Sequence, residues 1–222
     1  MTPTRFRGWS KAAIDFYREL EVENSKTFWT AHKEIYQTEV KAPFEALSEL
    51  VADEFGPLKI FRPNRDLRFS RDKTPYKTRC YAVTEGEGGE AFYVEISADG
   101  LVTATGYWMM ASDQLTRYRA AVDDEQTGQP LERTIAELRT RNLNIEGHRL
   151  KSAPRGYPTD HPRIELLRHK SVAAMRTFEP AAWLHTEAAA ERITEVWRAA
   201  APMNEWLARH VGRSTAPSPG SW

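Results

Sequence analysis

Apolar residues recur with helical spacing through the first quarter of the chain. Ser10 precedes a predicted helix near 11–20, and a second helix is expected to begin at Asn24 or Ser25. Pro43 is expected to interrupt that second helix, because proline lacks the amide hydrogen that a helix interior needs. The helical pattern then resumes and ends at Gly56-Pro57.

From residue 58 onward apolar and polar residues alternate, a period of two that is typical of β-strands. Phe92, Val94 and Ile96 are expected on one strand face, and Ala98-Asp99-Gly100 is expected to form a tight turn. Short links between consecutive strands indicate an antiparallel meander. The expected strands are 58–70, 77–85, 91–98 and 101–109.

The second half of the chain alternates between the two patterns. Helices are expected from Ser112, from Pro130, after Asp160 and over 185–210, with strands near 144–152 and 171–178. Helices, then a meander, then more helices predict an α+β protein with a central antiparallel sheet flanked by N-terminal and C-terminal helices. The predicted organisation is a single domain over 1–212 and a disordered C-terminal tail over 213–222, which is rich in proline, serine and glycine.

Length and composition agree with this organisation. The 222 residues are enough for one large domain, and no repeat or linker divides them. A single cysteine excludes an intrachain disulfide, and no apolar run reaches the length of a membrane span or a signal peptide. We therefore expect a cytoplasmic protein that has no membrane partner. The sequence leaves the oligomeric state open.

Positive charge is concentrated in one segment of the chain. Residues 62–79, RPNRDLRFSRDKTPYKTR, hold seven basic and two acidic residues and so carry a formal charge of +5, although the whole chain has equal numbers of basic and acidic residues. Because like charges repel in a compact chain, they either spread into solvent or converge on an anion. Overall neutrality argues against a general DNA-coating protein, while nucleic acid is not excluded as a local partner.

The alternation within this stretch suggests which side chains would meet a ligand. Leu67 and Phe69 would share the core face of a strand, which places Asp66 and Arg68 together on the polar face. Pro75 would stiffen the loop that leads to the return strand. The candidate ligand-binding residues are Arg65, Asp66, Arg68, Arg71, Asp72, Lys73, Tyr76 and Lys77. The alternative is a solvated network in which Asp66 and Asp72 neutralise the neighbouring arginines.

A second basic stretch covers residues 148–170 and surrounds turns that are rich in proline and glycine. Arg155, Tyr157 and His161 interleave charge and aromatic rings, which can bind a nucleotide. The alternative is an ordinary loop in which Asp160 caps the following helix, and it is the interpretation that we favour from sequence.

Other motifs do not indicate a reaction. Ser70 and Lys73 match S-x-x-K, but they are expected to end a strand, whereas the catalytic motif opens a helix. The GEGG sequence at 86–89 lacks the pattern of a phosphate-binding loop. The six histidines show no spacing typical of a metal site, so we expect no metal and no cofactor. Cys80 is expected in the core.

Three segments together resemble a known family. They are FYRELEVENSKTFW, the central RPNRDLRFSRDKTPYKT and the later LKSAPRGYPTDHP with ELLRHK. The chain is similar in these segments to the family named domain of unknown function 2461, over about Phe16 to Val211. The resemblance implies a single intracellular α+β domain, supplies no catalytic residue and marks the two basic stretches as shared motifs, which suggests that they meet in one site.

Three functions follow from these observations. The leading hypothesis is recognition of an anionic, phosphorylated small molecule or nucleotide in a cleft between the two basic stretches. The first alternative is an enzyme acting on a phosphorylated substrate, with Asp66 or Asp72 as its acid–base group. The second is a structural or protein-interaction domain whose basic hairpin docks an acidic partner.

Overall fold

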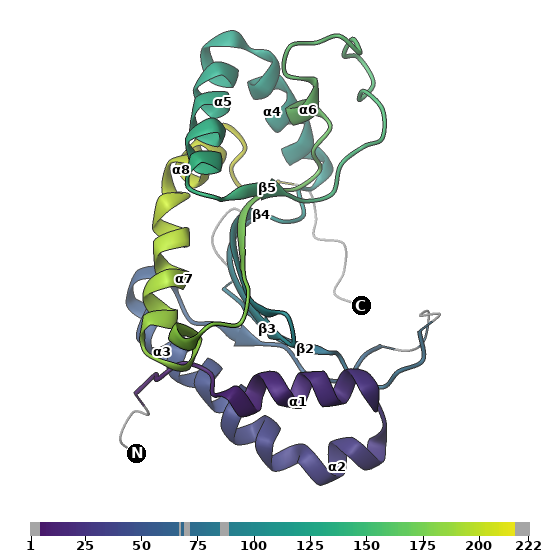
Figure 1. Ribbon diagram of the computed structural model, residues 1–222. Coiled ribbons are helices and arrows are strands. Elements are labelled where there is room, and N and C mark those ends of the chain that lie inside the picture. The colour runs from purple at the N-terminus through teal and green to yellow at the C-terminus, as the bar shows by residue number, and fades with distance from the viewer. Residues whose placement is uncertain (1–4, 67, 69–71, 85–88, 216–222) are drawn as a thin grey trace. The chain divides into compact units, whose positions relative to one another are not determined.

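The computed structural model describes residues 5–66, 68, 72–84 and 89–215. The strands in this part of the chain form a six-stranded antiparallel sheet with the order β1-β2-β3-β4-β6-β5 (Figure 1). The sheet and its accompanying helices confirm the α+β class. The strands are β1 (Lys59–Ile60), β2 (Arg79–Val83), β3 (Glu90–Ser97), β4 (Gly100–Tyr107), β5 (Asn144–Glu146) and β6 (Val172–Phe178).

The chain folds as two compact units, each assembled from three separate segments. The first unit contains 1–84, 93–103 and 177–195, and the second contains 85–92, 104–176 and 196–222. One change of unit lies between β2 and β3, and the other four lie within β3, β4, β6 and the helix α7 (Ala188–Ala199) rather than in a linker, which explains why the sequence shows no domain boundary.

The first unit begins with helices that the sequence largely predicted. They are α1 (Lys11–Val22), α2 (Lys26–Ile35), the π-helix η1 (Tyr36–Lys41) and α3 (Ala42–Phe55). The Ser25 hydroxyl accepts a hydrogen bond from the Phe28 amide at 3.0 Å and so caps α2. The expectation that Pro43 breaks the helix is wrong. The wide turn of η1 precedes Pro43, which lies in the first turn of α3, where a missing amide hydrogen costs least.

The core of the first unit forms around Trp9, which is fully buried. Its ring packs edge-on against Phe44 at a centroid distance of 4.9 Å, and its indole nitrogen donates to the Val40 carbonyl at 3.3 Å. The 3-10 helix η3 (Ala182–His185) contacts the same region, since Leu184 accepts a hydrogen bond from the Trp9 amide at 3.0 Å. Gly8, at φ 83°, lets the backbones approach, because a Cβ there would lie 2.4 Å from the Leu184 oxygen.

Strand β2 and the second half of β3 follow the predicted alternation, whereas β4 is buried at seven of its eight positions and does not. Val94 and Ile96 are buried and their neighbours Tyr93 and Glu95 are half-buried. The expected strand over 58–70 is wrong in length, because β1 ends at Ile60. Beyond it, among described residues, only Asn64 makes a further strand-like bridge, with Tyr76. Leu67 and Phe69, on which the predicted alternation depended, lie outside the described residues.

Several helices in the second half of the chain begin or end at other residues than the sequence predicted. Pro130 does not open a helix but lies inside α5, which Asp124 caps by accepting from the amides of Gln126 and Thr127. Asp160 does not cap α6, whose N-cap position is Arg163. The helix expected over 185–210 is two helices that meet at Ala200. The helices here are α4 (Ser112–Asp123), α5 (Glu125–Thr140), α6 (Ile164–Leu167), α7 (Ala188–Ala199) and α8 (Ala201–His210).

Two further expectations concern the C-terminal tail and the absence of a membrane span. Residues 216–222 of the expected tail lie outside the described residues, while Ser214 and Thr215 hydrogen-bond to Asp113. Among the helices that the structure describes, none is both long and apolar enough to cross a membrane.

Candidate functional site

The basic stretch at 62–79 is a hairpin in the first unit. Its two legs pair through the Arg65 amide, which donates to the Pro75 carbonyl at 2.9 Å, and the Lys77 amide, which donates to the Pro63 carbonyl at 2.8 Å. Asn24 holds the returning leg, because its side-chain amide donates to the Tyr76 carbonyl at 2.9 Å and its oxygen accepts from the Tyr76 amide at 3.1 Å. The two legs therefore pair across the loop, as the sequence suggested.

Arg65 and Asp72 stabilise the hairpin itself. The Arg65 Nε donates to the Tyr76 carbonyl at 2.9 Å, and its Nη1 forms an ion pair with Asp72. Asp72 also accepts from the Thr74 amide at 2.9 Å and from the Thr74 hydroxyl at 2.8 Å. The hydrogen bonds from Thr74, assisted by the charge of Arg65, lower the pKa of Asp72. Both side chains are thus engaged within the hairpin.

Arg68 and Asp66 form the two-point pair that the sequence suggested. The Arg68 Nε lies 3.0 Å from one Asp66 oxygen, and Nη2 lies 2.6 Å from the other. The side-chain and backbone hydrogen bonds of Arg68 lower the pKa of Asp66 to about 2. The Arg68 side chain is 76 % exposed, so this pair is on the surface. Arg71, another candidate, lies outside the described residues.

The remaining hairpin candidates divide between core and surface. Tyr76 is buried, and its ring stacks on Trp29 at a centroid distance of 4.2 Å and an angle of 11°. The Lys77 ammonium donates to the Arg62 carbonyl at 2.9 Å and lies 4.7 Å from the centre of the Tyr81 ring. Tyr76 and Lys77 therefore support the hairpin, whereas Lys73 is exposed.

The second basic stretch belongs to the second unit, and most of its polar contacts are local. The His161 Nε2 lies 3.0 Å from an Asp123 oxygen, and its Nδ1 accepts from the Arg163 amide at 3.0 Å. The Tyr157 ring meets His161 edge-on at 6.4 Å, and Arg155 is exposed. His161 therefore links this stretch to the end of α4, within the second unit. Because the two stretches lie in different units, their sharing of one ligand stays a prediction.

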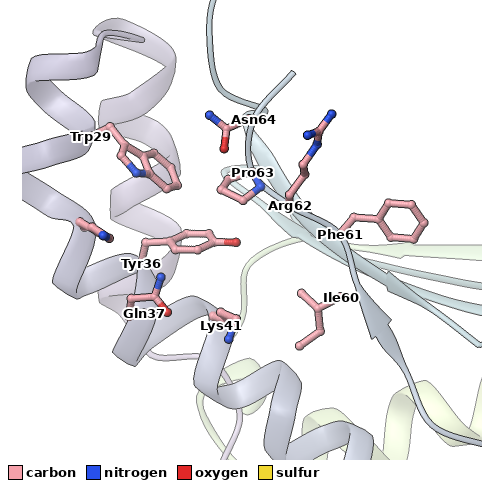
Figure 2. Close-up of a pocket in the computed structure, with 10 residues that line it drawn as sticks. Trp29, Tyr36, Gln37, Lys41, Ile60, Phe61, Arg62, Pro63 and Asn64 are labelled. Carbon is pink, nitrogen blue, oxygen red and sulfur yellow. The ribbon is translucent and has the colours of Figure 1, made fainter. Parts of the chain in front are cut away.

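A pocket of about 480 Å³ lies in the first unit, beside the hairpin. One wall comes from α2 and η1, and the other from β1 and the segment that leads into the hairpin (Figure 2). Figure 2 shows the Tyr36 ring reaching from its helix toward Pro63, with Trp29 above it and Lys41 below. The lining residues are Trp29, Lys33, Tyr36, Gln37, Lys41, Ile60, Phe61, Arg62, Pro63 and Asn64.

The charge of this pocket is entirely basic. Three of its lining residues, Lys33, Lys41 and Arg62, are cations, and none of its described lining residues is a carboxylate. Lys41 pairs with Glu45 at 2.5 Å, while neither Lys33 nor Arg62 forms a side-chain ion pair with a described residue. An anion that enters would therefore meet two cations that form no ion pair with a described carboxylate, although the charge of Arg62 helps to lower the pKa of nearby Asp66.

Tyr36 gives the pocket a neutral and fixed wall. Its hydroxyl lies 3.9 Å from the sulfur of buried Cys80, and burial together with that thiol raises the Tyr36 pKa well above its ordinary value. Burial likewise raises the pKa of Cys80 to about 12, which makes the thiol a core group, as expected.

Sequence reasoning missed most of this pocket. Trp29 and Tyr36 have the helical spacing typical of core residues, and Arg62 was counted in the charge of the stretch without being a candidate. One signal was present: Trp29, Lys33, Gln37 and Lys41 recur every four residues, which places them along one edge of the helix. The facing segment, Ile60–Asn64, could be matched to that edge only through the fold.

The described residues include no group of three or more histidine, cysteine, aspartate or glutamate side chains that could hold a metal ion. A family model described as conserved hypothetical protein (DUF2461) matches residues 12–206. No curated protein and no solved structure matches the chain.

Proposed function

For this chain, which belongs to the DUF2461 family of conserved hypothetical proteins, we propose binding of an anionic, phosphorylated small molecule in the pocket of the first unit. The observation that carries the proposal is the lining: Lys33 and Arg62 are among the residues that line a concave space, and none of the described lining residues is a carboxylate. Lysine supplies a point charge and arginine a planar fork, and both suit phosphate oxygens.

This proposal moves the ligand from the expected cleft between the two basic stretches to a pocket beside the first of them. Arg65 and Lys77 are engaged in holding the hairpin together, and Arg68 is paired with Asp66 on the surface. Lys33 and Arg62 form no ion pair with a described carboxylate, and Arg62 acts on Asp66 only through its charge. The hairpin then acts mainly by positioning Arg62, whose carbonyl accepts the hydrogen bond of Lys77.

The enzyme alternative gains no support from its two carboxylates. A general acid at neutral pH needs a raised pKa, whereas the pKa of Asp66 is lowered to about 2 and that of Asp72 is also lowered. Both carboxylates hold hairpin groups and neither lines the pocket. We therefore propose binding, with no reaction assigned to either residue.

Calorimetric titration with inorganic phosphate, pyrophosphate and glucose 6-phosphate tests the proposal. Arg62→Ala should weaken binding by roughly 1.5–3 kcal/mol, the range for a hydrogen bond to a charged group. Arg133→Ala is the matched control, because Arg133 is exposed on α5 in the other unit.

Two results would contradict this proposal. A larger loss in Arg68→Ala than in Arg62→Ala would place the anion at the hairpin tip instead of the pocket. Failure of every phosphate in the panel to bind would favour the alternative in which the basic hairpin docks an acidic protein.

A further inference from the structure

We infer that the ligand of this pocket is an aromatic phosphate, in which a planar apolar ring enters the pocket and the phosphate stays at its rim. The inference rests on the proposed function and extends it from a charge to a chemical class. It is carried by the contrast between the apolar walls of the pocket and the cations around them.

The size of the pocket is the first argument. Its volume of about 480 Å³ falls within the range of small-molecule sites. A water molecule occupies about 30 Å³ in the liquid, so the pocket holds many times the volume that a phosphate group needs. An inorganic phosphate at the rim would leave most of the space to water, whereas a ring would displace it.

The walls are apolar and held in place. Trp29 cannot turn easily, because its ring is stacked on Tyr76, and Tyr36 is 2 % exposed. Opposite them stand Ile60 and Pro63, with the Ile60 side chain directed into the space below Tyr36 in the view of Figure 2. Rigid apolar walls on both sides favour a flat, apolar body over a flexible or strongly hydrated one.

The two lysines of the helical wall lie at different places along the rim of the pocket. Lys33 and Lys41 are eight residues apart, which is on the order of 10 Å along the helix at about 1.5 Å per residue. Lys41 already pairs with Glu45 at 2.5 Å, so its charge is less available to a phosphate than that of Lys33. Lys33 and Arg62, on opposite walls, therefore form the phosphate end.

Two amides complete the arrangement. Gln37 and Asn64 line the pocket, one on each wall, and their side chains make no hydrogen bond to another described residue. An amide can both donate and accept, so these two groups can bind the polar edge atoms of a ring. A heteroaromatic ring such as that of a nucleotide would use them, whereas a purely hydrocarbon ring would not.

Comparison of ligands on the unmodified protein tests the inference. Phenyl phosphate should bind roughly tenfold or more tightly than inorganic phosphate, because burial of a ring removes apolar surface from water. Phenyl phosphate should also bind more tightly than glucose 6-phosphate, whose sugar ring is polar. AMP should bind at least as tightly as phenyl phosphate, because its base can reach the amides of Gln37 and Asn64.

Two substitutions locate the ring and the charge. Ile60→Thr keeps a β-branched side chain in β1 and should reduce the preference for phenyl phosphate over phosphate several-fold, as the apolar wall becomes polar. Gln37→Glu adds a carboxylate at an exposed position of η1 and should weaken the binding of every anion tested. Gln126→Glu, at an exposed position of α5, should leave anion binding unchanged.

The outcomes separate this inference from the proposed function. Equal affinity for phenyl phosphate, glucose 6-phosphate and inorganic phosphate would overturn the aromatic ligand and leave anion binding intact. Benzoate binding as tightly as phenyl phosphate would overturn the phosphate assignment. Binding of none of these anions would remove the proposed function as well. The ligand comparison needs no variant, so a failure of Ile60→Thr to fold would not obscure it.

Discussion

Charged side chains of the hairpin have two distinct roles, which are visible only residue by residue. Arg65, Asp72 and Lys77 bind backbone and side-chain groups of the hairpin and so fix its shape. Arg62 has no described carboxylate partner and lines the pocket. The charge of +5 over 62–79 is therefore partly structural, as the self-neutralising alternative proposed.

The Asp66 carboxylate offers a direct measurement of this local electrostatics. Its pKa of about 2 in the folded protein lies below the ordinary value of about 3.9, because Arg68 hydrogen-bonds the charged form. The pair therefore contributes to stability above about pH 4, and the contribution is lost as the pH falls through 2. Carboxyl-detected NMR titration should show this pKa.

Arg68→Gln should return the pKa of Asp66 toward its ordinary value, while Arg133→Gln should leave it unchanged. An ordinary Asp66 pKa in the unmodified protein would show that the pair does not form in solution.

Helix interruptions were harder to predict than helices. Pro43 and Pro130 both occur within helical stretches, against the simple rule that proline ends a helix. At Pro43 the preceding π-helix changes the hydrogen-bond partners, and at Pro130 the helix begins earlier than expected because Asp124 caps it.

The turn between α4 and α5 depends on Gly128. Arg163 is buried there and donates to the carbonyls of Val122 at 2.6 Å and Asp123 at 2.8 Å. A Cβ on residue 128 would lie 2.3 Å from the Val122 oxygen and 2.6 Å from the Arg163 Nε. Gly128→Ala should therefore lower the free energy of unfolding by roughly 1–3 kcal/mol, which is typical of overpacking, as measured by urea denaturation.

Gln126→Ala, at an exposed position of the same helix, should change the stability by no more than about 0.5 kcal/mol. Equal stability of the two variants would mean that the close approach around residue 128 relaxes without cost.

Over the whole molecule the charges cancel, since 31 basic and 31 acidic residues give no net charge. Attraction of an anion must then come from local groups such as Lys33 and Arg62. Local charge pairing at an accessible site weakens as salt rises, because the screening length is about 10 Å at 0.1 M and shorter above it.

Phenyl phosphate should therefore bind progressively more weakly between about 0.05 M and about 0.5 M sodium chloride, with a steeper dependence in the unmodified protein than in Arg62→Ala. Calorimetry at each salt concentration measures both slopes. Identical slopes would indicate that Arg62 does not contact the anion.

The sequence by itself determined the features that depend on neighbours along the chain. Helical and alternating periods predicted the first two helices, the turn at 98–100 and the α+β class, since each follows from local spacing. The pairing of Arg68 with Asp66 likewise joins residues two positions apart. The family resemblance was also visible in the sequence, and the match over 12–206 confirms it.

Only the tertiary structure decided where the chain forms a pocket. Trp29 and Tyr36 have the spacing of core residues, and nothing in their segment shows that Ile60–Asn64 packs opposite them. The division into two units, which falls within β3, β4, β6 and α7, is equally invisible, because an element that passes between units needs no turn or linker there. Periodicity reports which side chains face inward, whereas a pocket arises where two inward-facing walls from distant segments fail to fill the space between them.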